Sequence, residues 1–145
     1  MEIKIVDAEK IRPLRHSVLR TGFPFSTTLY DRDNNNETIH LAFLEKDKIV
    51  TCATLYPEDT KKTKSKNAYR LRGMATDLRF RRMGHGRSLM EESFKRLEEE
   101  GCDVLWCNAR LAAIDFYESL GFKTKGKMFN IEGIGPHYYM YKKIT

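Results

Sequence analysis

The stretch from Leu71 to Met90 constrains the fold more than any other part of the chain. A strand pattern ends at Thr76, a basic turn follows, and an amphipathic helix pattern begins at Gly84 or His85. Further strand and helix patterns lie on both sides of this stretch. This order of elements indicates a mixed α/β domain.

Length and composition indicate a single domain over residues 1–145. The chain has 145 residues, of which 41% are hydrophobic, and this is enough for one substantial core. No apolar run approaches the roughly 18 residues of a transmembrane helix, and the first residues lack an apolar signal region. We therefore expect a cytoplasmic protein, monomeric or homodimeric, with no membrane partner.

The cysteines predict neither disulfides nor a metal site. Cys52, Cys102 and Cys107 are odd in number and contain no C-x-x-C pair. Reduced thiols are the natural interpretation in such a chain.

Residue periodicity predicts the remaining elements. Strands are predicted over residues 2–6, 38–45, 48–56, 69–76, 102–107, 122–127 and 137–144, and helices over 8–20, 84–100 and 111–120. Lys46-Asp47 predicts a hairpin turn, Pro13 a break in the first helix, and Gly101 and Gly121 the ends of the later helices. The charged segment 57–67 is predicted to be a connection.

The turn before the second long helix has the features of a phosphate site. Gly84 and Gly86 lack a Cβ, so an anion can approach the backbone closely where helix N–H groups point outward. The basic residues around this point are Arg79, Arg81, Arg82 and Arg87. A merely solvated basic turn is the alternative interpretation.

Two common nucleotide motifs do not fit. A dinucleotide fingerprint needs a third glycine where Leu89 stands. The segment 121–127 matches most of a P-loop, but Met128 occupies the position of the magnesium-binding hydroxyl.

Two segments together carry a family resemblance. Arg81-Arg82-Met83-Gly84-His85-Gly86 fits R-x-x-G-x-G between a strand and a helix. About 30 residues later, AIDFYESLGF (residues 113–122) fits A-x-x-x-Y-x-x-x-G-F. The chain thus resembles the GNAT superfamily of N-acetyltransferases, and the order of elements matches along its whole length.

The resemblance implies a GNAT-like α/β fold: a mixed sheet with a splayed parallel strand pair and helices on both faces. It implies acetyl-CoA as co-substrate, with the basic loop on the pyrophosphate and backbone groups near Met74–Thr76 on the pantetheine arm and thioester. Arg110 stands where the family often has asparagine, and Asn108 lies two residues earlier. The implied cofactor-binding residues are Met74, Ala75, Thr76, Arg81, Arg82, Met83, Gly84, His85, Gly86, Arg87, Asn108, Arg110, Ala113, Phe116 and Tyr117.

The resemblance also implies direct attack by a primary amine, with Tyr117 as the acid that protonates the leaving thiolate. An amine must lose a proton before it attacks, so a base is needed. His137 is slightly favoured, with Tyr138 or Tyr139 beside the acceptor; His40, Glu58, Asp77 and ordered water are the other candidates. Helix periodicity alone makes Tyr117 an ordinary half-buried tyrosine, and His137 has a structural interpretation as well.

Other interpretations remain open at this stage. Arg72, on a predicted central strand, pairs either with an internal acid or with a carboxylate of the acceptor. The net charge of +6 suits an anionic partner. The lysine-rich run 61–66 lacks interleaved aromatic residues, so we expect a solvated loop and no nucleic-acid partner. A non-catalytic acyl-CoA sensor of the same fold is the main alternative function.

Overall fold

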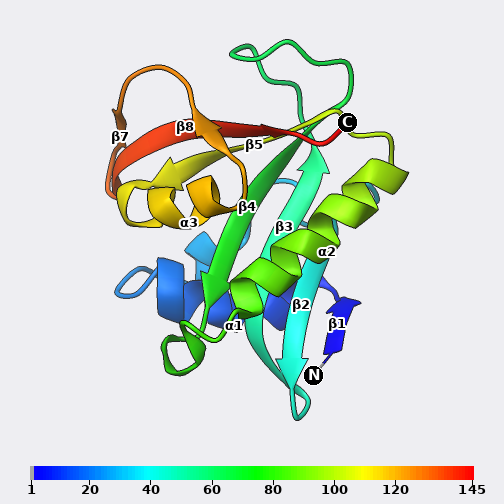
Figure 1. Ribbon diagram of the computed structural model, residues 1–145. Coiled ribbons are helices and arrows are strands. Elements are labelled where there is room, and N and C mark those ends of the chain that lie inside the picture. The colour runs from blue at the N-terminus through cyan, green and yellow to red at the C-terminus, as the bar shows by residue number, and fades with distance from the viewer. Residues whose placement is uncertain (1) are drawn as a thin grey trace. The chain divides into compact units, whose positions relative to one another are not determined.

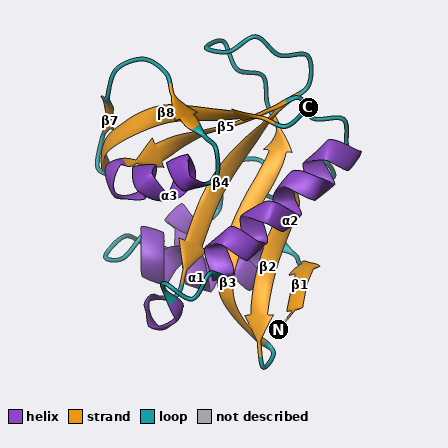
Figure 2. Cartoon of the chain, viewed as in Figure 1, coloured by secondary structure: helices purple, strands orange, loops and turns teal. Residues whose placement is uncertain are grey.

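The structure is a computed structural model that describes residues 2–145, and the chain divides into two compact units. The first unit comprises the residues up to Tyr56 together with Leu71–Arg96, and the second comprises Pro57–Arg70 and Leu97–Thr145. The strand β4 (Ala68–Thr76) contributes residues to both units. Figure 1 labels the elements, and Figure 2 colours them by type.

An antiparallel ladder forms the sheet of the first unit. β1 (Glu2–Ile5) pairs with β2 (Ile39–Glu45), and β2 pairs with β3 (Lys48–Pro57). Lys46 and Asp47 join β2 to β3 with φ values of 49° and 66°. Two consecutive positive φ angles are the mark of a tight two-residue hairpin turn. The predicted hairpin is confirmed.

The break predicted at Pro13 is wrong. The helix α1 (Ala8–Leu19) continues through the proline. Pro13 lies on the exposed side, where water can bond the carbonyl that loses its helical N–H partner. On the other side, Ile11 and Leu14 are buried and hold the helix to the sheet.

Helices cover both faces of this sheet, as predicted. Successive strand residues point to opposite faces. Ala42 of β2 belongs to the core cluster that contains Ile11 of α1. Its neighbour Phe43 stacks on His85, the first residue of α2 (His85–Glu99), with 4.3 Å between ring centroids. Figure 2 shows α1 behind β2 and β3 and α2 in front of them.

A buried ion pair fastens α1 to the segment that follows it. The Arg15 guanidinium, fully buried, donates to both carboxylate oxygens of Asp33 at 2.6 and 3.0 Å. It also donates to the Thr28 carbonyl at 2.8 Å and to Thr54 Oγ1 of β3 at 2.6 Å. Thr28 ends a short 3₁₀ turn, Phe25–Thr28. One side chain thus connects a helix, an irregular segment and a strand.

The second unit holds a mixed sheet with one parallel pair. Ala68 and Arg70 of β4 pair in parallel with Val104 and Trp106 of β5. The antiparallel partners along the rest of the sheet are β5 (Val104–Arg110) with β8 (Gly135–Lys143), and β8 with β6 (Lys123–Thr124) and β7 (Phe129–Ile131).

Several predicted bounds in the second unit are wrong. The strand predicted over 122–127 shortens to β6, because Gly126 has a φ of 86° and turns the chain, and β7 was not predicted. The helix predicted over 111–120 opens with a 3₁₀ turn, Leu111–Ala113, before α3 (Ile114–Ser119).

The predicted glycine stops after α2 and α3 are confirmed. Gly101 and Gly121 have φ values of 77° and 96°. In each case the next residue donates its N–H to the carbonyl five residues earlier; for α3 this is Phe122 to Tyr117, at 3.1 Å. Such backbone hydrogen bonds to the last carbonyls form the Schellman motif that ends a helix. It fixes the backbone at Tyr117.

Loss of the Arg15 guanidinium should destabilise the protein strongly. Arg15→Met leaves the Asp33 carboxylate buried without its partner, and breaking such a pair costs about 3–5 kcal/mol. Urea unfolding measures the loss. The control is Glu92→Gln, which removes the half-exposed Glu92–Arg96 pair and should cost less than about 0.5 kcal/mol. A loss below about 1 kcal/mol for Arg15→Met contradicts the role of the buried pair.

Candidate active site

A capped turn leads from β4 into the basic loop. Asp77 accepts hydrogen bonds from the Arg79 backbone at 3.0 Å and from its guanidinium at 3.1 Å, at the start of the 3₁₀ turn Leu78–Phe80. These bonds, with the nearby charges of Arg79 and Lys48, lower the pKa of Asp77 to about 2. A carboxylate this acidic is a weak base, and its place in the structure is that of a cap.

The loop itself exposes its backbone at the start of α2. Arg82 and Gly84 have φ values of 63° and 82°, and the first helical bond runs from Ser88 N to Gly84 O at 3.0 Å. The N–H groups of His85 and Gly86 precede that bond, so they lie at the positive end of the helix. The loop residues that are exposed are Arg81, Arg82, Met83, Gly84 and Arg87.

The His85 side chain points away from this exposed backbone. It is 7% exposed, stacks on Phe43, and places Nε2 3.7 Å from Glu45 Oε1. The side chain thus anchors the loop to β2, while the backbone remains available for a ligand.

The end of β4 carries an irregularity that the sequence analysis overlooked. Gly73 has a φ of 62°, and a Cβ placed there would lie 2.9 Å from Arg15 Nε. A glycine inside a strand pattern is the signal that could have revealed this. Three predicted site residues follow directly: Met74 and Thr76 are half-buried, and Ala75 packs in the core.

In the second unit, β5, α3 and β8 hold the other predicted site residues. Asn108 and Arg110 lie on β5 opposite Tyr139 and His137 of β8. Ala113 ends the 3₁₀ turn, and Phe116 and Tyr117 lie on α3. The structure therefore brings Arg110 and His137 together as cross-strand neighbours on one face.

Tyr117 is buried among aromatic rings. It is 6% exposed and meets Phe116 and Phe122 edge-on, each at 5.3 Å between centroids. Burial raises the pKa of Tyr117 well above its usual value, and the nearby Cys107 raises it further. The phenol keeps its proton at neutral pH. Within residues 2–145, its hydroxyl has no hydrogen-bond partner.

His137 is buried with its tautomer fixed. It is 3% exposed, Nδ1 lies 2.8 Å from the Gly135 carbonyl, and the ring stacks on Phe129 at 6.0 Å. A carbonyl only accepts, so Nδ1 carries the hydrogen and the lone pair of the neutral ring is on Nε2. Residues two apart on a strand share a face, so Tyr139 lies on the His137 side and Tyr138 on the other.

The other candidate bases are occupied. His40 is buried, with Nδ1 2.8 Å from Thr54 Oγ1 and Nε2 2.8 Å from the Asp33 carbonyl, and burial lowers its pKa. Glu58 forms an ion pair with Arg70 at 3.2 Å.

Arg72 lies flat on an aromatic ring. Its guanidinium carbon is 4.1 Å from the centroid of Tyr30, and that of Arg15 is 3.9 Å from the same centroid. Two guanidinium groups this close to one centroid require the two faces of the ring. The one buried carboxylate nearby, Asp33, is already held by Arg15. Among the described residues, no carboxylate forms an ion pair with Arg72.

The three cysteines are free and buried. Burial raises the pKa of Cys52 and Cys107 to about 12 and that of Cys102 to about 11. The nucleophile of cysteine chemistry is the thiolate, so these thiols are inert at neutral pH.

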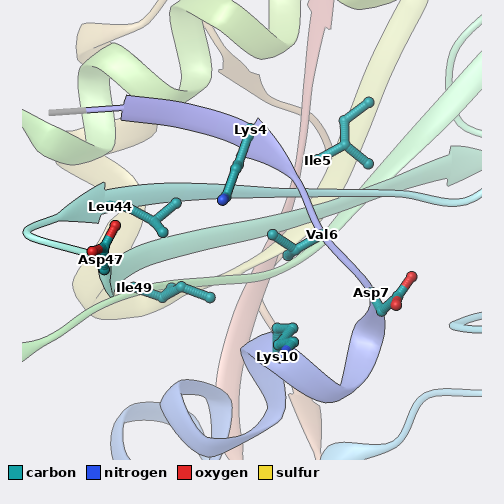
Figure 3. A pocket seen from close by; sticks show the side chains of 8 residues that line it. All are labelled: Lys4, Ile5, Val6, Asp7, Lys10, Leu44, Asp47 and Ile49. Carbon is teal, nitrogen blue, oxygen red and sulfur yellow. The ribbon is translucent and has the colours of Figure 1, made fainter.

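A pocket of about 450 Å³ lies elsewhere in the first unit, at the N-terminal strand (Figure 3). Charges of both signs line it, and none of its residues is a predicted site residue. The lining residues are Lys4, Ile5, Val6, Asp7, Lys10, Leu44, Asp47 and Ile49.

Two features are absent from residues 2–145. No helix in this range is both long and apolar enough to cross a membrane. Nowhere in it do three or more histidine, cysteine or acidic side chains gather as metal ligands would.

Comparison with known proteins identifies the family. The model of the Acetyltransferase (GNAT) family matches residues 8–122, which include both motifs. The chain belongs to the GNAT family of acetyltransferases. The N-acetyltransferase activity and the α/β fold that the two motifs predicted are thereby confirmed.

Individual relatives agree with this assignment. The uncharacterized N-acetyltransferase YitI of Bacillus subtilis (strain 168) is 33% identical over 144 residues, 99% of this chain and 97% of its own. The ribosomal protein bS18-alanine N-acetyltransferase of Escherichia coli (strain K12) is 44% identical over 52 residues, 34% of this chain and 35% of its own.

Solved structures share the fold. An aminoglycoside 6'-N-acetyltransferase complexed with coenzyme A superposes with a TM-score of 0.79 at 17% identity, covering 100% of this chain and 98% of that one. The ribosomal-protein-S18-alanine N-acetyltransferase from Escherichia coli gives 0.75 at 20% identity, covering 99% and 94%.

The native protein should resist thiol reagents. All three cysteines are buried with raised pKa values, so at pH 8 the thiolate fraction is small and hidden from solvent. In a disulfide-exchange assay we expect no rapidly reacting thiol in the folded protein and three in urea. One thiol that reacts at the unfolded rate in the folded protein contradicts this.

Proposed function

We propose that this GNAT protein transfers the acetyl group of acetyl-CoA to a primary amine by direct attack. The observation that carries the proposal is Tyr117, a buried phenol whose hydroxyl is not bonded to any other described residue. A protein that merely bound the cofactor has no need of a proton donor held in this state.

The loop Arg81–Gly86 is proposed to hold the pyrophosphate. Its backbone is exposed at the positive end of α2, and arginines surround it. No atom lies within 4 Å of a Cβ placed on Gly84, so the surface there is open to a ligand. The loop therefore fits a phosphate group by charge, by donor type and by space.

The strand residues Met74–Thr76 are proposed to hold the pantetheine arm, and a backbone N–H there would stabilise the charge that develops on the thioester oxygen. One such donor contributes about 10²–10³ in rate in other acyl-transfer sites. The positive φ of Gly73 supports this assignment, because an irregular backbone turns N–H groups out of the regular ladder.

Proton transfers are assigned to two side chains. Tyr117 gives its proton to the leaving thiolate, since burial keeps the phenol protonated. His137 accepts the proton of the acceptor amine on Nε2, since its Nδ1 hydrogen is donated to Gly135. The other three candidate side chains already have partners: Asp77 caps a turn, Glu58 forms an ion pair, and His40 bonds to Thr54 and Asp33.

Arg72 is proposed to contact an anionic group of the acceptor. It is half-buried, it is held in place by Tyr30, and no described carboxylate pairs with it. A planar guanidinium with free N–H groups suits a carboxylate.

Gly86→Val should abolish coenzyme A binding. The side chain would stand where the pyrophosphate is proposed to approach the first turn of α2, and Gly86 lies within the helix without a positive φ. Gly84→Val is a poorer test, because the φ of 82° there strains any side chain. Isothermal calorimetry measures the affinity, and Leu78→Ala, in an exposed residue of the 3₁₀ turn that precedes the loop, is the control. An unchanged coenzyme A affinity in the folded Gly86→Val variant would show that the loop does not bind the pyrophosphate.

Tyr117→Phe should lower kcat while leaving coenzyme A affinity unchanged. The ring remains and only the hydroxyl is lost, and removal of a general acid costs about 10²–10⁴ in rate. Thiol release from acetyl-CoA over a panel of primary amines reports turnover. Wild-type turnover in the folded variant removes Tyr117 from the mechanism, and cofactor binding without transfer to any amine points to a sensor.

A further inference from the structure

The segment 58–67, which follows β3 within the second unit, contacts aromatic side chains of that unit and is called the docked segment here. Trp106 Nε1 donates to the Glu58 carbonyl at 2.9 Å near one end of the segment. At the other end, Asp103 accepts from the backbone N–H groups of Lys66 and Asn67 at 2.6 and 3.0 Å. The segment is therefore fastened at both ends.

Its centre is fastened to one tyrosine. The Tyr139 hydroxyl lies 2.6 Å from Thr60 Oγ1 and donates to Thr63 Oγ1 at 3.1 Å. Lys62 lies between these threonines, and its Nζ is 5.1 Å from the ring centroids of both Tyr139 and Phe129. A primary amine is thus held over two aromatic rings.

These rings adjoin the proposed base. Phe129 of β7 pairs with His137 of β8 and stacks on its ring at 6.0 Å. Tyr139 is two residues from His137 on the same face of the strand. Lys62 thus places a primary amine, the reacting group of an acceptor, beside the residues that are proposed to contact the acceptor.

The other lysines of the segment differ from Lys62. The ammonium groups of Lys61, Lys64 and Lys66 contact no aromatic ring and no carboxylate within residues 2–145. All of them are exposed, as Lys62 is. Lys62 therefore differs from the other three lysines in its contact with the aromatic rings and not in its exposure, so those lysines are matched controls.

We propose that Lys62 is an intramolecular acceptor: in the absence of another amine, the enzyme acetylates Lys62 Nζ. This rests on the proposed function. The N–C bond to the acetyl group forms as the C–S bond of acetyl-CoA breaks. The ammonium loses two protons overall. His137 accepts one and releases it to water, and the other, through water, replaces the proton that Tyr117 gives to the thiolate. The products are acetyl-lysine, free coenzyme A thiol and one proton.

The modification would change the docked segment. Acetylation removes the positive charge that holds Lys62 over the rings. Phe129 and Tyr139 would then be open to the ammonium group of a separate acceptor. Unmodified Lys62 thus occupies the acceptor position, and the enzyme can release it from that position by acetylating it.

Isotopically labelled acetyl-CoA and peptide mass spectrometry test this proposal on the full chain. Labelled acetyl on Lys62 should accumulate at least tenfold faster than on Lys61 or Lys64, which report chemical acetylation. Its first-order rate constant should not change when the protein is diluted tenfold, because the amine is on the same molecule. Tyr117→Phe should lower the Lys62 rate about 10²-fold or more and leave the rates at Lys61 and Lys64 unchanged.

Two results overturn the proposal. One is that Lys62 is labelled no faster than Lys61 and Lys64, in protein that calorimetry has shown to bind coenzyme A. The other is a rate constant that falls with dilution, which places the transfer between molecules. Neither result affects the proposed function, whose own failure would appear as absent coenzyme A binding or as no transfer to any amine of the panel.

Discussion

The buried ion pair of Arg15 and Asp33 is the interaction on which the first unit depends most. The same Arg15 guanidinium also bonds Thr28 of the irregular segment 21–37 and Thr54 of β3, so it links α1 to both. The same guanidinium lies so close to residue 73 that a glycine is required there, because the Cβ of any larger residue would meet Arg15 Nε. Because Met74–Thr76 follow Gly73 directly, an interaction made for stability also shapes the strand end proposed to contact the thioester.

Strand alternation distributes the chemistry of the second unit. On β5, Trp106 faces the docked segment, while the next residue, Cys107, faces Tyr117. On β8, His137 and Tyr139 share the face of Trp106. The proposed proton donor and the proposed base therefore lie on opposite faces of one sheet.

Local rules predicted the parts of the protein that local contacts determine. The hairpin at Lys46-Asp47, the glycine stops and the glycine-containing turn that opens α2 each depend on a few consecutive residues. The Pro13 prediction failed because exposure, a tertiary property, decides whether water can replace the lost hydrogen bond. Likewise, nothing in the lysine-rich run reveals that Thr60 meets a tyrosine 79 residues later.

The candidate site divides in the same way. The loop Arg81–Gly86 and Tyr117 could be proposed as site residues from the sequence because their motifs are short and contiguous. The tautomer of His137 and the free guanidinium of Arg72 could not be found, since each depends on a partner that only the fold supplies or withholds. The same holds for Lys62, whose position over two rings separates it from identical neighbours.

A crystal structure of the protein with coenzyme A would show whether the loop Arg81–Gly86 and Tyr117 contact the cofactor. We expect pyrophosphate oxygens on the backbone N–H groups of His85 and Gly86, and the thiol sulfur within hydrogen-bond distance of the Tyr117 hydroxyl. A pyrophosphate bound away from this loop, or a sulfur with no access to Tyr117, would contradict this expectation.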